Sequence, residues 1–290
     1  MQRRELGPNG PMVGAIGLGT NPLASFTHRP SMDEAVRLLA RAAELGATLW
    51  DTADAYCLDD TDIGYGEWMC RNARVSLPAD LRERIVIATK GGTVRPDGGW
   101  EQDCSPEHLR EAIDASLLAL QTDCIDLYQI HRPDDKVPFA DSVGALANAH
   151  AEGKIRLAGL SNVSAQQIDE AMKIVPIASV QNCYGYGNRG PETDGVLDKC
   201  RELGLAFLPF SSFGGVAGAK GLGESGALAD VARELGISPQ RVVLAWLLQK
   251  YERMIPIPGF TRMESIADCA AADEVVLSQG HIARLDVAPA

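Results

Sequence analysis

The feature that most constrains this chain is a regular alternation of short apolar runs with longer segments of helical periodicity. The runs are nearly continuously apolar, as is typical of parallel strands that are covered on both faces. Strands are predicted at residues 15–18, 49–53, 85–89, 125–130, 155–160, 178–181, 205–210 and 254–257. Helices, whose apolar residues recur every three or four positions, are predicted at 33–45, 63–72, 106–120, 139–152, 165–174, 193–203, 227–235 and 239–250.

Eight strands that alternate with helices predict an α/β fold, a (β/α)8 TIM barrel with a short N-terminal β-hairpin and extra C-terminal helices. The chain has 290 residues, a length common among single barrels, and no linker divides it. We therefore expect one domain over residues 1–290. A doubly wound sheet is the alternative, because a count of strands does not establish that the sheet closes.

Composition argues against several classes of function. The formal net charge of −12 disfavours nonspecific binding to nucleic acid and to anionic membranes, because both repel an acidic surface. No apolar run approaches the roughly 20 residues of a membrane helix, and no signal peptide is visible at the N-terminus. The seven cysteines are scattered without a C-x-x-C pair, so we expect free thiols, no metal site and a cytoplasmic location.

Ionisable side chains follow three successive predicted strands. Asp51 and Tyr56 lie at the end of the second strand, Lys90 ends the third and His131 ends the fourth. In a parallel barrel these ends form one mouth, where catalytic groups gather. A lysine beside a tyrosine favours phenolate, so we expect Lys90 to lower the pKa of Tyr56 and make it a usable proton donor. Asp51 would hold the lysine, and His131 could orient a substrate oxygen. Together these groups indicate proton delivery to a carbonyl.

Short motifs in this order and spacing carry a family resemblance. They are GLGT at 17–20, DTADAY at 51–56, TKGG at 89–92, QIH at 129–131, GLSN at 159–162, VQN at 180–182, AWL at 245–247 and IPIPG at 255–259. With them the chain resembles the aldo-keto reductases from about Leu6 to Ala272. The resemblance implies a catalytic tetrad of Asp51, Tyr56, Lys90 and His131.

The activity that the resemblance implies is NADPH-dependent reduction of an aldehyde or ketone to an alcohol. Hydride would pass from the nicotinamide to a small-molecule carbonyl substrate, and Tyr56 would supply the proton. The residues expected to bind NADP(H) are Gly19, Thr20, Asp51, Ser161, Asn162, Gln181, Phe210, Ser211, Ser212, Phe213, Gly259, Thr261, Arg262, Ser265, Asp268 and Cys269. The rim of the substrate pocket is expected to draw on Phe26, His28, Trp50, Trp100 and Arg132, with Phe213 beside them.

Within this set, the resemblance gives individual roles. Thr261 and Arg262 would bind the adenosine 2′-phosphate at the start of a helix, where an anion also gains from the helix N-terminus. Phe210 would stack on the nicotinamide ring. The family often has glutamate and asparagine where this chain has Asp268 and Cys269, which weakens the expected adenine contacts. Cys57 stands where a glycine often follows the tyrosine, either narrowing the pocket, exposing a reactive thiol or lying in solvent.

Other interpretations compete with this one. Residues 221–226 match the dinucleotide fingerprint G-x-G-x-x-G, but no strand precedes them, so a loop after the seventh strand is expected instead. A nucleotide-sensing regulatory subunit, similar to the potassium-channel β subunits of the family, is a second hypothesis. A barrel isomerase or lyase without nicotinamide is a third.

Overall fold

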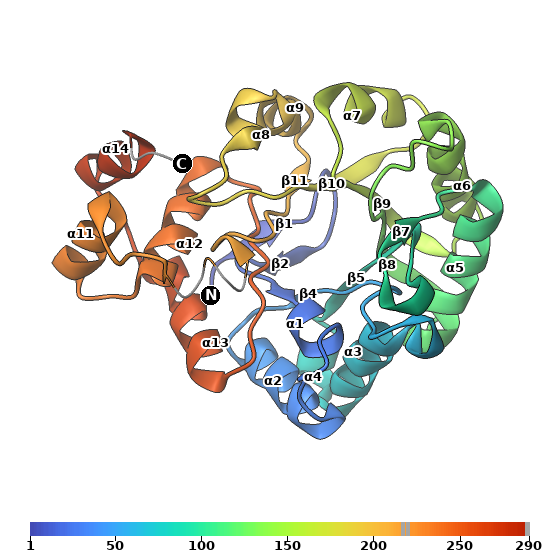
Figure 1. Cartoon of the computed structure of the whole chain (residues 1–290), viewed down its shortest axis with the longest axis horizontal. Helices are drawn as coiled ribbons and strands as arrows, with labels where there is room; N and C mark the ends of the chain where they lie inside the picture. Colours follow the sequence, from blue (N-terminus) through green and yellow to red (C-terminus); the bar gives the residue numbers. More distant parts are fainter. Residues whose placement is uncertain (216–217, 219–220, 288–290) are drawn as a thin grey trace.

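The computed structural model describes residues 1–215, 218 and 221–287. Its central sheet is parallel, and most helices form a ring around it (Figure 1). In spatial order the strands are β11 (Ala206–Phe207), β10 (Ile177–Gln181), β9 (Ile155–Ser161), β8 (Ile125–Ile130), β5 (Val86–Gly91), β4 (Leu49–Asp51) and β3 (Leu18–Gly19). Each is a predicted strand, although the first, second and seventh are shorter than expected.

The eighth predicted run closes this sheet without forming a regular strand. On one side, the amide of Ile255 donates to the carbonyl of Phe207 at 2.9 Å. On the other, the amide of Gly17 donates to the carbonyl of Pro256 at 2.9 Å. Pro256 and Pro258 have no N–H, so the run cannot complete a ladder of its own. The sheet is nevertheless joined at both edges, which confirms the barrel and excludes the open doubly wound sheet.

The helices of the outer ring follow the predicted segments closely. They are α2 (Met32–Glu44), α3 (Tyr65–Ser76), α5 (Pro106–Leu120), α6 (Phe139–Ala151), α7 (Ala165–Ala171), α9 (Val196–Leu203) and α12 (Pro239–Lys250). Ser31, Ser105 and Ser238 begin three of them by accepting a backbone N–H with the side chain. The predicted helix 193–203 is broken, because Gly195 has a φ of +83° and separates α8 (Gly190–Thr193) from α9.

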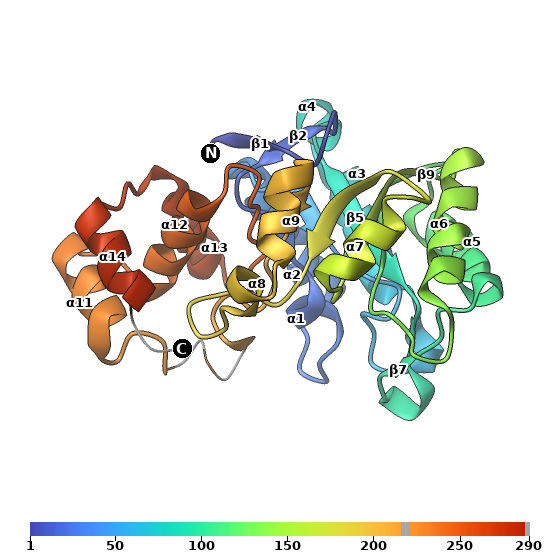
Figure 2. The ribbon, with the colours of Figure 1, turned by 90° about the horizontal axis from the view of Figure 1, so that it is seen from above.

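Two hairpins and several further helices make up the rest of the regular structure in the described residues. The N-terminal hairpin pairs β1 (Arg3–Glu5) with β2 (Met12–Gly14), and a second hairpin pairs β6 (Thr93–Val94) with β7 (Glu101–Gln102). Further helices in the described residues are α1 (Asn21–Ala24), η1 (Asp60–Asp62), α4 (Ala79–Arg82), η2 (Pro96–Gly98), α11 (Gly226–Leu235), α13 (Met263–Ala270), η3 (Ala271–Glu274) and α14 (Gln279–Val287). Helices α11 and α14 project beyond the ring (Figures 1 and 2).

The core has two layers because strand side chains alternate between the two faces of the sheet. Leu49, Ala88 and Leu127 fill the barrel interior, which Leu6 and Val13 of the N-terminal hairpin region close from below. The larger layer lies between the barrel and the helices. Figure 2 shows β1 and β2 at one end of the molecule and α1 and β7 at the other, so only the second end remains available for a mouth.

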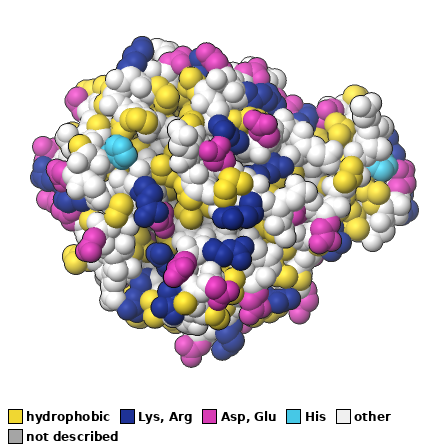
Figure 3. All heavy atoms as spheres, turned by 180° about the vertical axis from the view of Figure 1, so that it is seen from behind, with side chains coloured by type: hydrophobic (Ala, Val, Ile, Leu, Met, Phe, Trp, Pro, Cys, Tyr) yellow, Lys and Arg dark blue, Asp and Glu magenta, His cyan; other side chains and the backbone are white. Residues whose placement is uncertain are grey.

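The surface at the closed end has a mixed character. Lysines and arginines, acidic residues and hydrophobic residues are interspersed over this face, without one continuous basic band (Figure 3). Among the described residues, no helix combines the length and the apolar character needed to cross a bilayer.

Candidate active site

Polar side chains replace the apolar filling of the barrel at its open end. Asp51 lies two residues beyond the interior residue Leu49, and Lys90 lies two residues beyond Ala88. Because the period of a strand is two, these side chains point into the barrel like their apolar predecessors. The parallel pairing of β4 with β5 sets Asp51 opposite Ala88, so Lys90 lies two residues nearer the mouth, and its long side chain reaches the carboxylate of Asp51.

The predicted tetrad comes together around Lys90. Its Nζ lies 2.8 Å from Oδ2 of Asp51, 2.8 Å from the carbonyl oxygen of Thr52 and 3.3 Å from the hydroxyl of Tyr56. The rings of Tyr56 and His131 meet edge to face with centroids 5.7 Å apart. The four groups therefore surround one small volume at the open end of the barrel.

Two amides complete the surroundings of Asp51. Its Oδ1 accepts from Nε2 of Gln181 at 2.7 Å and from Nε2 of Gln129 at 3.4 Å. Gln181 was expected to hold the nicotinamide, and its Nε2 donor is directed to the carboxylate here. Gln129 was absent from the predicted site, although its place on β8, two residues beyond the interior residue Leu127, indicates an inward side chain.

The expected net lowering of the tyrosine pKa is wrong. Burial raises the pKa of Tyr56 above its ordinary value, and this effect exceeds the lowering by Lys90. Asp51 also raises this pKa, while a side-chain interaction with Asn21 lowers it. Tyr56 therefore remains a neutral phenol near pH 7 and keeps the proton that a donor needs. Asn21, the first residue of α1, is a neighbour of the hydroxyl that sequence reasoning missed.

The histidine of the tetrad is held in its neutral form. Burial lowers the pKa of His131 well below its ordinary value, and the positive charges of Lys90 and Arg132 lower it further. Its Nδ1 is buried and has no hydrogen-bond partner within the described chain. Asn162 fixes the backbone behind it, because its Nδ2 donates to the carbonyl of His131 at 3.0 Å. An orphaned ring nitrogen beside a phenol fits a site that awaits a polar ligand.

The residues expected to bind the nicotinamide half of a coenzyme lie around the same mouth. Ser161 ends β9 and Asn162 follows it, and Nδ2 of Asn162 donates to Oγ of Ser161 at 3.0 Å. Phe210 packs against the top of the interior core, and Phe213 packs against the outer layer. Ser212 is buried and Ser211 is exposed beside it, in the loop that follows β11.

Gly19 and Thr20, which were also expected to bind the coenzyme, form contacts within the barrel itself. Gly19 pairs with Gly259 across the seam between the first and the eighth strand. A side chain on Gly19 would approach the carbonyl oxygen of Ile257 to 2.7 Å, so glycine is required for this contact. The hydroxyl of Thr20 donates to the backbone carbonyl of Asp51 at 3.0 Å.

The residues expected at the adenosine phosphate lie where the eighth run enters α13. Thr261 and Arg262 are exposed, and Arg262 is the residue that precedes the first helical turn. Within the described chain the guanidinium of Arg262 has no hydrogen bond or ion pair. An unpaired guanidinium at the N-terminus of a helix fits a phosphate. Ser265, one turn further, is half-buried.

The expected adenine contacts need correction. Cys269 is 3% exposed and belongs to the hydrophobic layer, because Ile266 and Cys269 share the inner face of α13. Its thiol therefore does not face a coenzyme. The carboxylate of Asp268 forms an ion pair with Arg241 at 2.7 Å and accepts from the hydroxyl of Ser238. Asp268 is thus tied to α12.

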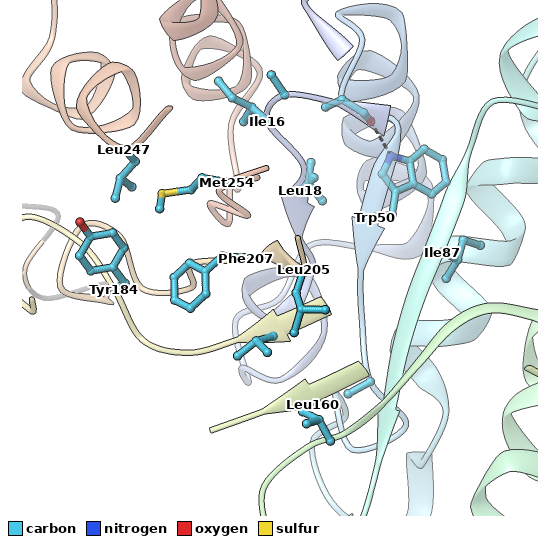
Figure 4. Close-up of a cluster of buried hydrophobic side chains, with 14 of the residues drawn as sticks. Ile16, Leu18, Trp50, Ile87, Leu160, Tyr184, Leu205, Phe207, Leu247 and Met254 are labelled. Carbon is cyan, nitrogen blue, oxygen red and sulfur yellow. Dashed lines mark hydrogen bonds between the residues drawn. The ribbon is translucent and has the colours of Figure 1, made fainter. Parts of the chain in front are cut away.

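One predicted pocket residue, Trp50, lies elsewhere. It neighbours Asp51 on β4, so its side chain points to the opposite face of the sheet. The indole is 0% exposed, lies in the layer between barrel and helices, and donates to the carbonyl of Ala47 at 3.1 Å (Figure 4). The prediction that Trp50 lines the substrate pocket is wrong, because strand alternation sends it into the core.

The other residues of the predicted rim lie near the mouth or in the loops around it. The ring of Trp100 meets His131 edge to face with centroids 6.4 Å apart, and Arg132 donates to Oδ1 of Asn162 at 3.2 Å. Phe26 and His28 are exposed neighbours in the loop after α1, with ring centroids 5.6 Å apart.

The thiol beside the tyrosine is neither solvated nor reactive. Cys57 is 0% exposed, and its Sγ donates to the carbonyl of Ala55 at 3.3 Å. Burial raises the pKa of Cys57 to about 12, so the thiolate is absent near pH 7. Of the predicted loop, residues 222–225 form turns and bends and Gly226 begins α11, and the last strand before them in the described part of the chain is β11.

Comparison with known proteins agrees with this geometry. The model of the Aldo/keto reductase family matches residues 15–288. The chain belongs to this family. An uncharacterized oxidoreductase of Schizosaccharomyces pombe is 34% identical over 253 residues, which is 87% of this chain and 78% of that protein.

Solved structures of family members superpose on the whole chain. A thermostable aldo-keto reductase in complex with the inhibitor epalrestat has a TM-score of 0.81 and 29% identity, with 99% of each chain covered. An aldo-keto reductase from Klebsiella pneumoniae in complex with NADPH has a TM-score of 0.80 and 27% identity. In that comparison 99% of this chain and 94% of the other are covered.

Proposed function

We propose that this enzyme reduces an aldehyde or ketone to the alcohol with NADPH. The observation that carries the proposal is the contact of the Tyr56 hydroxyl, 3.3 Å from Nζ of Lys90, which in turn lies 2.8 Å from Asp51. A buried phenol beside a buried ammonium is an acid whose anion is stabilised once the proton has left. Membership of the aldo/keto reductase family supports the same chemistry.

Each residue of the tetrad has a separate task in this reaction. Tyr56 gives its proton to the carbonyl oxygen, and Lys90 stabilises the phenolate that remains. Asp51 holds Lys90 in place through its Oδ2. Neutral His131 donates a hydrogen bond to the carbonyl oxygen and so aligns it with the phenol. NADPH, when bound, supplies the hydride for the carbonyl carbon.

The coenzyme is assigned to the arc from β9 to α13. Ser161, Asn162 and Gln181 would hold the carboxamide of the nicotinamide, and Phe210 would stack on its ring. Ser211, Ser212 and Phe213 would border the pyrophosphate, with Gly19, Thr20 and Gly259 at the opposite wall. Thr261, Arg262 and Ser265 would bind the 2′-phosphate, and the free guanidinium of Arg262 supports this assignment. Bound NADPH of the Klebsiella pneumoniae relative supports the choice of coenzyme.

We further propose a single domain over residues 1–290 and a cytoplasmic location. The barrel and the flanking helices share one continuous hydrophobic layer, which supports the first proposal. All seven cysteines are free thiols, as a reducing compartment permits, which supports the second.

The test is steady-state oxidation of NADPH with a panel of aldehydes and ketones, followed by absorbance. The proposal expects turnover with at least one carbonyl class, and faster turnover with NADPH than with NADH. Tight binding of NADPH without oxidation by any carbonyl would instead favour a nucleotide-sensing subunit. Failure to bind either coenzyme would overturn the assignment in favour of chemistry without nicotinamide.

A further inference from the structure

A buried arginine outside the tetrad joins two loops at the mouth of the barrel. Arg95 lies between β6 and η2 and is 4% exposed. All its five N–H donors bond backbone carbonyls: Nε bonds Gly99 at 2.7 Å, Nη1 bonds Ala55 at 3.1 Å and Cys57 at 2.7 Å, and Nη2 bonds Leu58 at 2.8 Å and Gly98 at 2.9 Å. No carboxylate of the described chain pairs with it, so its contacts serve geometry rather than charge compensation.

One side of this contact is the loop that carries the proposed proton donor. Ala55 and Cys57 flank Tyr56, and Arg95 binds the carbonyls of both. The loop belongs to no strand or helix at this point, so its position depends on such contacts. Arg95 therefore restrains the backbone on each side of the residue whose hydroxyl must reach the substrate oxygen.

The other side of the contact is the hairpin that carries Trp100. Arg95 binds the carbonyls of Gly98 and Gly99, and its guanidinium carbon lies 3.9 Å from the centroid of the Trp100 ring. That ring is 49% exposed and meets the ring of His131 edge to face. Stacking on a guanidinium fixes a large aromatic side chain that would otherwise be free to turn in solvent.

We propose that Arg95 is a positioning residue that sets the distance between Tyr56 and the Trp100 ring, and that Trp100 thereby selects carbonyl substrates with a flat aromatic group. The inference rests on the proposed carbonyl reduction and names its substrate class. Trp100 extends the ring contact between His131 and Tyr56 of the tetrad. An aromatic aldehyde gains a further ring contact there, and a small aliphatic aldehyde does not.

The first test is Arg95→Lys, which keeps the charge but offers three donors in place of a planar fork of five. The turnover number should fall by about 10–100-fold, because a shift of about 1 Å in a reacting group is enough for such a loss. The dissociation constant of NADPH should stay within about twofold of that of the unmodified enzyme, because Arg95 contacts none of the residues assigned to the coenzyme.

The chain offers a matched control at the closed end of the barrel. Arg4 binds three backbone carbonyls in the same way, those of Leu248, Tyr251 and Met254, at 2.7 to 2.8 Å. Arg4→Lys should lower stability much as Arg95→Lys does, while kcat and KM remain unchanged. A loss of turnover that is equal in both variants would show a general effect on folding and would overturn the proposal.

The second test is Trp100→Ala with benzaldehyde and propanal as substrates. The ratio of kcat/KM for benzaldehyde to that for propanal should fall by about two- to tenfold. In Arg95→Lys this ratio should fall too. Adding Trp100→Ala to Arg95→Lys should cause little further change, because both substitutions remove the fixed Trp100 ring from the substrate pocket. An unchanged ratio in Trp100→Ala would overturn the assigned substrate class.

Hydrogen exchange provides a readout that does not depend on activity. In Arg95→Lys, amides of residues 57–64 and 93–102 should exchange faster, and in Arg4→Lys they should not. Unchanged exchange in both segments would overturn the positioning role. If the unmodified enzyme reduces no carbonyl at all, the proposed function fails first, and the two failures are thereby distinguished.

Discussion

Nζ of Lys90 lies 2.8 Å from Oδ2 of Asp51, and the two side chains are only 0% and 3% exposed. Two charges withdrawn from water this far cost free energy that their mutual attraction only partly returns. The pair is therefore poor evidence for stability, and its placement beside a phenol indicates chemistry. Burial opposes the charge of Lys90, yet Asp51 and Tyr56 raise its pKa above the ordinary value, so the ammonium persists.

The first prediction concerns the proton donor. Tyr56→Phe keeps the ring that packs against His131 and removes the only proposed proton donor. Turnover should fall by about 10²–10⁴-fold, whereas the affinity for NADPH should persist. Stopped-flow kinetics measure turnover, and fluorescence titration with NADPH measures the affinity. Tyr65→Phe, at a phenol whose ring stacks with Arg29 and which has no role in the proposed site, is the control. Near-normal kcat in Tyr56→Phe would refute the proposed chemistry.

The second prediction concerns the buried ion pair. Lys90→Met leaves Asp51 without its cation, so the free energy of unfolding should fall by about 3–5 kcal/mol and activity should be lost. Adding Asp51→Asn should recover part of the stability but none of the activity, because the unpaired charge is then removed as well. Urea denaturation of the three proteins measures this. If Lys90→Met unfolds like the unmodified protein and keeps its pH–rate profile, Lys90 has no place in the tetrad.

The third prediction concerns the coenzyme. A guanidinium on the 2′-phosphate is a charge-assisted contact, worth about 1.5–3 kcal/mol or roughly one to two decades in affinity. Arg262→Ala should weaken NADPH by this amount and leave NADH nearly unchanged, and the preference should shrink as salt rises. Arg156→Ala, an exposed arginine at the start of β9, serves as the control. Equal losses for the two coenzymes would assign Arg262 to the fold.

The fourth prediction concerns a buried acid behind the barrel wall. Burial raises the pKa of Glu67 from 4.5 to about 7, while its hydrogen bond from Thr89 at 2.6 Å opposes the shift. Between pH 4.5 and about 7, Glu67 therefore keeps its proton in the folded protein and loses it in the unfolded chain. Stability from this group is present below about pH 4.5 and is lost as the pH rises through about 7.

Glu67→Gln tests this dependence directly, because glutamine keeps an acceptor for Thr89 and carries no charge. At pH 8 the variant should have a free energy of unfolding about 1–3 kcal/mol higher than the unmodified protein. At pH 4.5 the two should agree. Burial and the charge of Glu67 also raise the pKa of Asp54, so this second acid lowers the stability in the same direction as the pH rises. Glu67→Gln reduces the contribution of Asp54 without removing it. A stability difference that is independent of pH would contradict a buried, protonated Glu67.

Much of the fold follows from local patterns in the sequence. Apolar runs predict the strands, spacing of three to four predicts the helices, and Ser105 before Pro106 predicts the start of α5. The meeting of Asp51, Lys90 and His131 is also predictable, because parallel strands in a barrel end at the same mouth. The wrong prediction for Trp50 could also have been avoided from the sequence. Successive strand residues point to opposite faces, so the neighbour of an inward Asp51 must point outward.

The tertiary structure alone decided which groups touch and how far they are removed from water. The barrel closes through a run with two prolines, Arg95 binds the carbonyls of Ala55, Cys57 and Leu58, and Asp268 pairs with Arg241. All these contacts join residues that are distant in the sequence. The pKa of Tyr56 rises where the motif predicted a fall, because burial depends on everything packed around the phenol. Periodicity is a property of neighbours along the chain, whereas contact and desolvation are properties of the whole packed molecule.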